Sequence, residues 1–532
     1  MHRQMLASVV ATTCFLCACG VPEATAPDED YELVPEGKED NYRSPSAIEL
    51  SAKADATVTL DESARSLPDA DRAAQARDLV SAKLLQIGWF LNLYVADKED
   101  EDSNKGYGGF HAMARNSSVK ALSITPVDAV TYRFNFEATI AAQNDFLKVL
   151  PGEPVSGGGE RIALQMGRVS NADLLGGKWQ SRYDVHAWDP RTLPASDVES
   201  LPMVIAPLPR SQNAWLDTNR LYADGKLEVG AQFGWDYNEG RQDLANAEQL
   251  YDELLAIGFT SPVAKFADLK LDSAPLTRGG TYDGKPVTIS VKLIHPGMVA
   301  SPSADALKLR QALLDLLATK EVVLFNGHAG VSGRLLPADF RSTSAGNILP
   351  TEYPTLKLFD GYQILLIEGC QTYARFTDGF KQNPAKRGPN GELVNLDIVT
   401  STSYTWTTQG AESMEAILWP LVATSATKNI KPPTWDDVLR TMNAPPNQTA
   451  FMGVNGIDGD PHAHPYGKRD RLGKACTSNA ACGGEGNVCM KNASAKRVCG
   501  TVCTDDAGCP SGYRCASVAS SGTISTRACV AR

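Results

Sequence analysis

This 532-residue sequence lacks an excess of positive charge, a long apolar run and, over most of its length, cysteine. Its formal net charge of −11 argues against nucleic acid as a partner, because phosphate binding needs a basic surface. The body of the chain contains no apolar run long enough to span a membrane. Hydrophobic residues still make up 43% of the chain, which is enough to bury cores, and the length predicts about two to four domains.

Cysteine is confined almost entirely to the two ends of the chain. Cys14, Cys17 and Cys19 lie near the N-terminus, and one cysteine, Cys370, lies in the body. The even number and dense spacing of the rest predict a disulfide module over residues 474–532, built from two similar four-cysteine units. Zinc is the alternative, but the C-x5-C spacings lack the usual CxxC knuckles. The eight cysteines of this module are Cys476, Cys482, Cys489, Cys499, Cys503, Cys509, Cys515 and Cys529.

The first residues have a short basic start and a brief apolar stretch that ends in Leu16-Cys17-Ala18-Cys19-Gly20. This pattern resembles a bacterial lipoprotein signal peptide over residues 1–19, with Cys19 as the lipidated anchor; ordinary secretion is the alternative. The resemblance implies an exported protein of the bacterial cell envelope, attached to the outer membrane and facing the periplasm or the surface. Residues 20–50 are rich in proline and acidic residues and predict a disordered acidic tether.

The remaining chain divides into two regions of different pattern. Residues 51–209 predict an α+β domain, with a helix from Asp69 to Leu93 and strands at TYRFNFEATI and RIALQMG. Over residues 210–470, apolar strands alternate with helices: one helix capped by Asp243, one opened by Ser301-Pro302 and one around residues 413–423. This alternation predicts an α/β domain with a mainly parallel sheet between helix layers. Its five strands are LEVGAQFGW, VTISVKLIH, EVVLFNG, YQILLIEG and LVNLDIVTSTS.

Two of these strands end in residues that can carry chemistry. EVVLFNG leads into His328, and YQILLIEG leads into Cys370. Sites in open α/β sheets form outside the carboxyl ends of the strands, so neighbouring strands would present both side chains at one edge. An imidazole there can assist attack by the thiol, and the small residues beside the pair let backbone N–H groups hold an oxyanion. Those small residues are Ala329, Gly330 and Gly369.

An apolar strand ending in His near Gly, followed by another ending in Gly-Cys, resembles the caspase-like superfamily of cysteine peptidases. That superfamily includes caspases, metacaspases, legumains and gingipains, and the resemblance covers residues 210–470. It implies a caspase-like αβα sandwich in which His328 is the general base or acid and Cys370 the nucleophile, with the three small residues at the oxyanion. It also implies cleavage of protein or peptide substrates with no cofactor and no metal. The segment NEGRQDLANAEQLYDELLAIGF looks like the loop and first helix of the family.

Two further residues bear on this resemblance. The family usually places Gly directly after His, whereas Ala329 stands here. This departure favours the alternative function, an inactive caspase-like surface lipoprotein that acts as a binding module. Several members carry an acidic residue two positions before the Cys, so Glu368 is expected to line the specificity pocket and to favour Arg or Lys, with Asn as the second option. A plain ion pair between Glu368 and a neighbouring Arg is the structural alternative.

Three other patterns suggest roles of their own. Cys370 with His462 or His464 would be a papain-like order, although DGDPHAHPYG is rich in turn residues; the same segment could bind a metal ion. The polar stretch RFTDGFKQNPAKRGPNGEL, which contains Lys381, Lys386 and Arg387, is a candidate for self-cleavage. The cysteine-rich tail is expected to bind or space, with a partner that the sequence does not identify.

Overall fold

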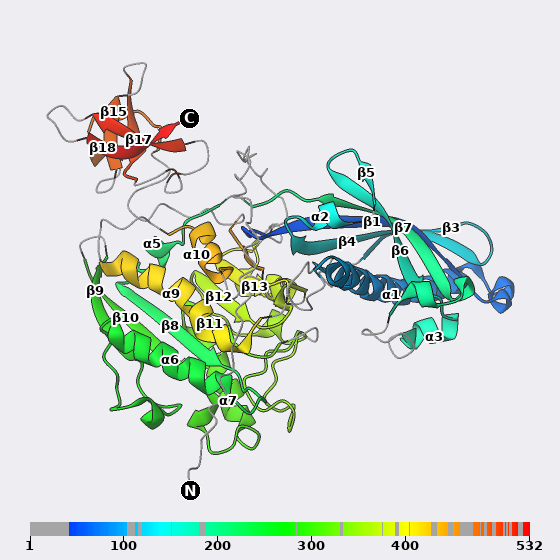
Figure 1. Cartoon of the computed structure of the whole chain (residues 1–532), viewed down its shortest axis with the longest axis horizontal. Helices are drawn as coiled ribbons and strands as arrows, with labels where there is room; N and C mark the ends of the chain where they lie inside the picture. The colour runs from blue at the N-terminus through cyan, green and yellow to red at the C-terminus, as the bar shows by residue number, and fades with distance from the viewer. Residues whose placement is uncertain are drawn as a thin grey trace, which may run out of the picture. The chain divides into compact units, whose positions relative to one another are not determined.

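The computed structural model describes most of the chain between Tyr42 and Arg532 (Figure 1). No helix in these parts is both long and apolar enough to cross a membrane. The described residues are 42–103, 112–114, 120–150, 152–179, 188–211, 213–282, 285–329, 333–374, 376–388, 393–403, 405–426, 433–444, 451–457, 472–478, 480–482, 487–491, 496–503, 506, 509, 513–519 and 525–532. The predicted signal peptide with Cys19, and the tether up to residue 41, lie outside them.

The first sheet is antiparallel and has the strand order β2-β4-β1-β7-β6-β5, with β3 also paired to β4. The helix α1 (Asp69–Ser103) packs on it and begins at the predicted residue but continues ten residues past Leu93. Alternation of buried and exposed residues, as in β4, explains why one face of the sheet forms a core. The strands are β1 (Ala47–Thr59), β2 (Ala112–Ala114), β3 (Lys120–Pro126), β4 (Thr131–Gln143), β5 (Glu153–Val155), β6 (Gly159–Gly167) and β7 (Val198–Pro207), with the short helices α2 (Phe146–Val149) and α3 (Asn171–Leu175) between them.

The prediction of a disordered tether over residues 20–50 is wrong for its last residues, 42–50. Residues 42–50 are ordered: Tyr42, Arg43 and Ser44 are buried, and β1 begins at Ala47. Composition suggested disorder because this stretch contains few aliphatic residues. Its polar side chains and backbone instead find hydrogen-bond partners on a second sheet and on a helix that covers it, which composition cannot reveal.

The second sheet is mixed α/β, with the order β14-β13-β12-β11-β8-β10-β9. Its five central strands are parallel, and β9 and β14 pair antiparallel at the two edges. The five apolar runs of the sequence are the five parallel strands, which confirms that part of the prediction. The strands are β8 (Lys226–Phe233), β9 (Leu276–Tyr282), β10 (Lys285–Ile294), β11 (Val322–Asn326), β12 (Gln363–Glu368), β13 (Leu396–Ser401) and β14 (Met452–Asn455).

Both faces of this sheet are covered. Alternate residues of β11 and β12 enter two separate cores: Leu324 and Leu366 pack toward one set of helices, Phe325 and Ile367 toward the other. The first set is α6 (Gln242–Ala256), α9 (Gly410–Ala426) and α10 (Trp435–Met442); Figure 1 shows α6 and α9 in front of the strands. The second set is α7 (Ala306–Thr319) and α8 (Phe376–Lys381), and the short α5 (Thr218–Leu221) precedes β8. Burial on both faces explains why the central strands read as continuous apolar runs.

Two helix starts differ from expectation. The helix expected at Ser301-Pro302 begins at Ala306, because Asp305 is its N-cap and accepts a hydrogen bond from the Ser301 N–H across a preceding turn. Asp243 does not cap α6; Arg241 stands at the N-cap, and Asp243 lies in the first turn and pairs with the Arg241 guanidinium.

The cysteine-rich region is a pair of hairpins, β15 (Asn487–Lys491) with β16 (Arg497–Thr501) and β17 (Tyr513–Ala519) with β18 (Ser525–Ala531). All eight cysteines form disulfides, which confirms the predicted module and leaves no thiolate there for zinc. Each half joins its first cysteine to its third and its second to its fourth, as a duplicated unit should. The bonds are Cys476–Cys489, Cys482–Cys499, Cys503–Cys515 and Cys509–Cys529.

Candidate functional site

The strands that lead to His328 and Cys370 are direct neighbours in the sheet. β11 and β12 run parallel, with Asn326 opposite Glu368, so the chain leaves both strands at the same edge. The Gly327 N–H donates to the Glu368 carbonyl at 3.1 Å and extends the pairing by one residue. The structure therefore brings the two residues to one strand edge, as the sequence predicted.

Gly369 fills a place where no side chain fits. A Cβ on Gly369 would lie 2.6 Å from the Gly327 carbonyl oxygen and 2.8 Å from the Ala329 Cβ. Ala329 is itself buried and packs in the core beneath the strand ends. These small residues let the two turns approach each other closely. Gly330 lies outside the described residues.

The His328 imidazole is held by a carboxylate that the sequence did not single out. Its Nε2 lies 3.1 Å from Oδ1 of Asp236, which follows β8, the other neighbour of β11. Burial by itself raises the pKa of Asp236, but hydrogen bonds from His328 and from the backbone N–H groups of Asn238 and Gln242 outweigh it and lower that pKa. Asp236 is therefore an anion that fixes the ring, and the Nδ1 side of the imidazole is turned away from it.

Aromatic rings fix the plane of the imidazole. Tyr237 stacks on His328 with ring centroids 4.5 Å apart and an interplanar angle of 22°, and Phe340 lies 5.6 Å away at a steep angle. The Arg341 guanidinium covers the other side of Tyr237, 3.5 Å from its ring centroid. The His328 side chain nevertheless remains about 20% exposed, so the ring is both oriented and accessible.

The Cys370 thiol is partly buried and is the only free cysteine of the described chain. Its Sγ lies 4.0 Å from the Thr405 carbonyl oxygen. Burial raises the pKa of this thiol, and hydrogen bonding at Thr405 offsets only part of that rise. Among the described contacts no hydrogen bond joins Sγ to the imidazole. The sulfur is therefore a thiol in this state, and a base must accept its proton before it can attack.

The backbone turn at Cys370 is strained. Gln371 has φ 59°, a left-handed conformation that residues other than glycine rarely adopt. Its N–H donates to the Ser403 carbonyl at 2.8 Å, and the Ser401 hydroxyl donates to the Gly369 carbonyl. Such conformations persist where surrounding bonds over-determine them, and they are frequent at functional turns.

Glu368 faces helix α9. Its side chain is fully buried, and its Oε1 accepts a hydrogen bond from the Ser413 hydroxyl at 2.7 Å. Burial raises the pKa of Glu368 to about 8, although Ser413 and Asn326 act in the opposite direction. The partner of the carboxyl group is thus a hydroxyl on α9 rather than an arginine, and the group is mostly protonated at neutral pH.

A second histidine stands at the same sheet edge. His295 follows β10 and is buried, with neither ring nitrogen hydrogen-bonded within the described chain. It stacks on Phe266 at 4.6 Å, and burial together with the charge of Arg241 lowers its pKa to about 4. Sequence reasoning missed both His295 and Asp236. Their common signal is a polar residue at or just after the end of a parallel strand.

Other predicted residues divide between buried, exposed and undescribed. Lys386, in the stretch suggested for self-cleavage, is fully buried and donates to the Gly361 and Asn395 carbonyls, whereas Arg387 is exposed. His462 and His464 lie outside the described residues.

No family model, curated protein or solved structure matches this chain. The chemistry of the site therefore rests on its own residues.

Proposed function

We propose that the protein is a caspase-like cysteine endopeptidase with His328 and Cys370 as its catalytic pair. The observation that carries the proposal is their position: an imidazole oriented by a carboxylate and the one free thiol among the described residues follow adjacent parallel strands. Nucleophile and base at neighbouring strand ends, with a third group that orients the base, is the arrangement that thiol acyl transfer requires.

The chemistry follows from the state of each group. The imidazole removes the Cys370 proton, and the thiolate attacks the peptide carbonyl to give a tetrahedral oxyanion held by backbone N–H groups at the two glycine-rich turns. The imidazolium then protonates the leaving amine, which leaves a thioester on Sγ. Water, activated by the neutral imidazole, hydrolyses the thioester and releases the acid. Asp236 stabilises the imidazolium and keeps its orientation.

Specificity for a basic residue before the cut would depend on Glu368. The Glu368 carboxyl lies under α9, and its pKa near 8 makes it largely neutral at pH 7. A preference for Arg or Lys based on charge should therefore grow as the pH rises through about 8. Asn is the second option, because a neutral acid can exchange hydrogen bonds with an amide. Since the Glu368 side chain is fully buried, either contact with a substrate requires α9 to move aside.

A binding module without activity is the second candidate. The observations that favour it are the partly buried Cys370 thiol with its raised pKa and the buried Ala329 beside His328. In either function, the N-terminal leader supports a proposal of export and lipid anchoring at Cys19, with the disulfide module as a binding or spacing element.

A peptide library, together with a peptidyl electrophile directed at thiols, tests the proposal. The wild type is expected to cleave, and the electrophile to label Cys370, as located by mass spectrometry of the labelled peptide. Cys370→Ala and His328→Ala are expected to lose both activities, while iodoacetamide at alkaline pH, where solvent hydroxide deprotonates the thiol, should still alkylate the His328→Ala protein. Folded wild type that neither cleaves nor reacts with the electrophile would favour the binding module.

A further inference from the structure

The turn that carries Cys370 is held from two sides. The residues after it form the 3-10 helix η8 (Thr372–Ala374), whose side chains are all buried. On the sheet side, the Ser401 N–H donates to the Thr372 hydroxyl at 2.9 Å. On the other side, the Tyr373 hydroxyl donates to Glu49 Oε1 in β1 at 2.5 Å. A strand of the first sheet therefore contacts the turn three residues after the nucleophile.

Glu49 joins this turn to the N-terminal end of the ordered chain. Its carboxylate is about 2% exposed, and its Oε2 accepts a hydrogen bond from the Tyr42 N–H at 3.0 Å. The Tyr42 ring lies edge-on to Tyr373 with centroids 5.0 Å apart. A buried carboxylate is tolerated only when donors satisfy it, so Tyr42 and Tyr373 hold Glu49 and are held by it.

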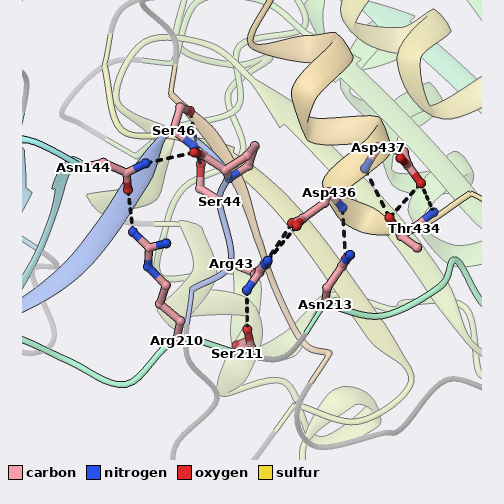
Figure 2. A network of polar contacts seen from close by, with 11 residues as sticks. Arg43, Ser44, Ser46, Asn144, Arg210, Ser211, Asn213, Thr434, Asp436 and Asp437 are labelled. Atoms are coloured by element: carbon pink, nitrogen blue, oxygen red, sulfur yellow. Dashed lines mark hydrogen bonds and ion pairs between the residues drawn. The ribbon is translucent and has the colours of Figure 1, made fainter. Parts of the chain in front are cut away.

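The segment that supplies these groups is itself fixed to the second sheet. Arg43 and Val454 exchange backbone hydrogen bonds at 2.8 Å, and the Ser44 hydroxyl donates to the Met452 carbonyl at 2.7 Å. Figure 2 shows the Arg43 guanidinium between Asp436 and Ser211; it pairs with both carboxylate oxygens of Asp436 at 2.9 and 2.6 Å. Tyr42 and Glu49 are thus fixed points from which Tyr373 can be held.

We infer, resting on the proposed function, that Glu49 is a positioning residue for Cys370 and acts through Tyr373. The left-handed Gln371 is unfavourable by itself, so the turn needs restraints on both sides to keep its shape. The sheet supplies one restraint through Ser401, and the Tyr373–Glu49 bond supplies the other. Without that bond, the turn relaxes and the sulfur leaves its buried place near Thr405.

Two variants and a matched control test the inference in the full chain. Tyr373→Phe removes the donor to Glu49. Glu49→Gln replaces one of the two acceptor oxygens by an NH2 group, so the side chain can no longer accept the bonds from both Tyr42 and Tyr373 in the same way. Tyr362→Phe is the control, because Tyr362 also donates to a buried carboxylate, Asp397, at 2.6 Å, but stands before β12 rather than after it. If one test variant does not fold, the other still gives the answer.

The first readout is iodoacetamide alkylation of Cys370, followed by mass spectrometry of its peptide from pH 6 to 10. Because one buried hydrogen bond is lost, Tyr373→Phe is expected to alkylate about fivefold faster than wild type. The midpoint of its pH profile should fall, since a less buried thiol ionises more easily. Glu49→Gln should move in the same direction, and Tyr362→Phe should match wild type. Rates and midpoints for both test variants equal to those of the control would overturn the inference.

The second readout is peptide turnover. Misplacement of the sulfur is expected to lower kcat about tenfold in Tyr373→Phe with KM unchanged. Simple destabilisation would also expose the thiol and slow turnover, so the comparison with Tyr362→Phe decides: that control loses an equivalent buried hydrogen bond but should change neither rate. Unchanged kcat in both variants would count against the role of Glu49. A wild type without turnover would sink the proposed function alone, because alkylation still decides whether Glu49 positions the thiol.

Discussion

His328 and Cys370 follow adjacent strands but are held in different ways. Side chains fix His328: a carboxylate bonds one ring nitrogen and an aromatic ring stacks on its face. Cys370 is held through its backbone turn, by the left-handed Gln371 and by bonds that reach the turn from Ser401, Ser403 and Glu49, and its sulfur is close to a carbonyl oxygen. A base that moves protons needs its ring in the right orientation, whereas a nucleophile needs a backbone conformation that places its sulfur correctly. Substitutions that loosen one residue should therefore leave the other in place.

The largest expected effect comes from removing the carboxylate that orients the base. Asp236→Asn is expected to lower kcat about a hundredfold with little change in KM, because the imidazolium loses its counter-ion and the ring its preferred tautomer. Steady-state cleavage of a peptide substrate measures this. Iodoacetamide alkylation of Cys370 should remain at the wild-type rate, since its turn does not depend on Asp236.

A nearby carboxylate provides the control for this prediction. Asp243 is also buried, but it pairs with Arg241 instead of the imidazole. Asp243→Asn is expected to keep most of the activity. Equal losses in the two variants would mean that the loop as a whole, rather than the Asp236–His328 bond, supports catalysis.

Asn326 lies two positions before His328, and Glu368 lies two positions before Cys370. Of these two residues only Glu368 titrates, so a change of pH affects this position on one strand and not on the other. Asn326 is neutral, but burial raises the pKa of Glu368 to about 8 from an ordinary value of 4.5. The folded protein therefore binds a proton that the unfolded chain releases between these values. The stability contributed by this group is fully present below about pH 4.5 and is lost as the pH rises through 8, on the order of 5 kcal/mol.

Glu368→Gln should remove this loss, because an amide does not titrate. Urea unfolding at pH 5 and pH 8.5 is expected to show a smaller difference between the two pH values for the variant than for wild type. Other buried carboxyls with raised pKa, Glu321 and Glu415, will keep some pH dependence in both proteins. Glu62→Gln, at an exposed ion pair, serves as the control. An unchanged difference in Glu368→Gln would show that this carboxyl titrates normally.

The sequence predicted the strands at the site better than the contacts around them. Apolar runs marked β11 and β12, and His328 and Cys370 were found two residues after the ends of these strands, because a strand buried on both faces leaves a continuous signal. Asp236 was missed because its bond to His328 joins residues 92 positions apart. The alternation of a strand placed Glu368 on the same side as Cys370, but could not show that α9 covers that side. The ordered segment at Arg43 depends likewise on partners far along the chain.

The smallest expected effect concerns the ring that stacks on the base. Tyr237→Ala removes one face of the support for His328 and is expected to lower kcat about threefold, the size of a single aromatic contact. Tyr237→Phe keeps the stacking and should retain wild-type kcat, so the pair separates the ring from its hydroxyl in the same cleavage assay. Alkylation of Cys370 should be unaffected in both variants. A change in that rate with Tyr237→Ala would show that the two strand ends are coupled through the rings around His328, and would contradict separate restraints on His328 and Cys370.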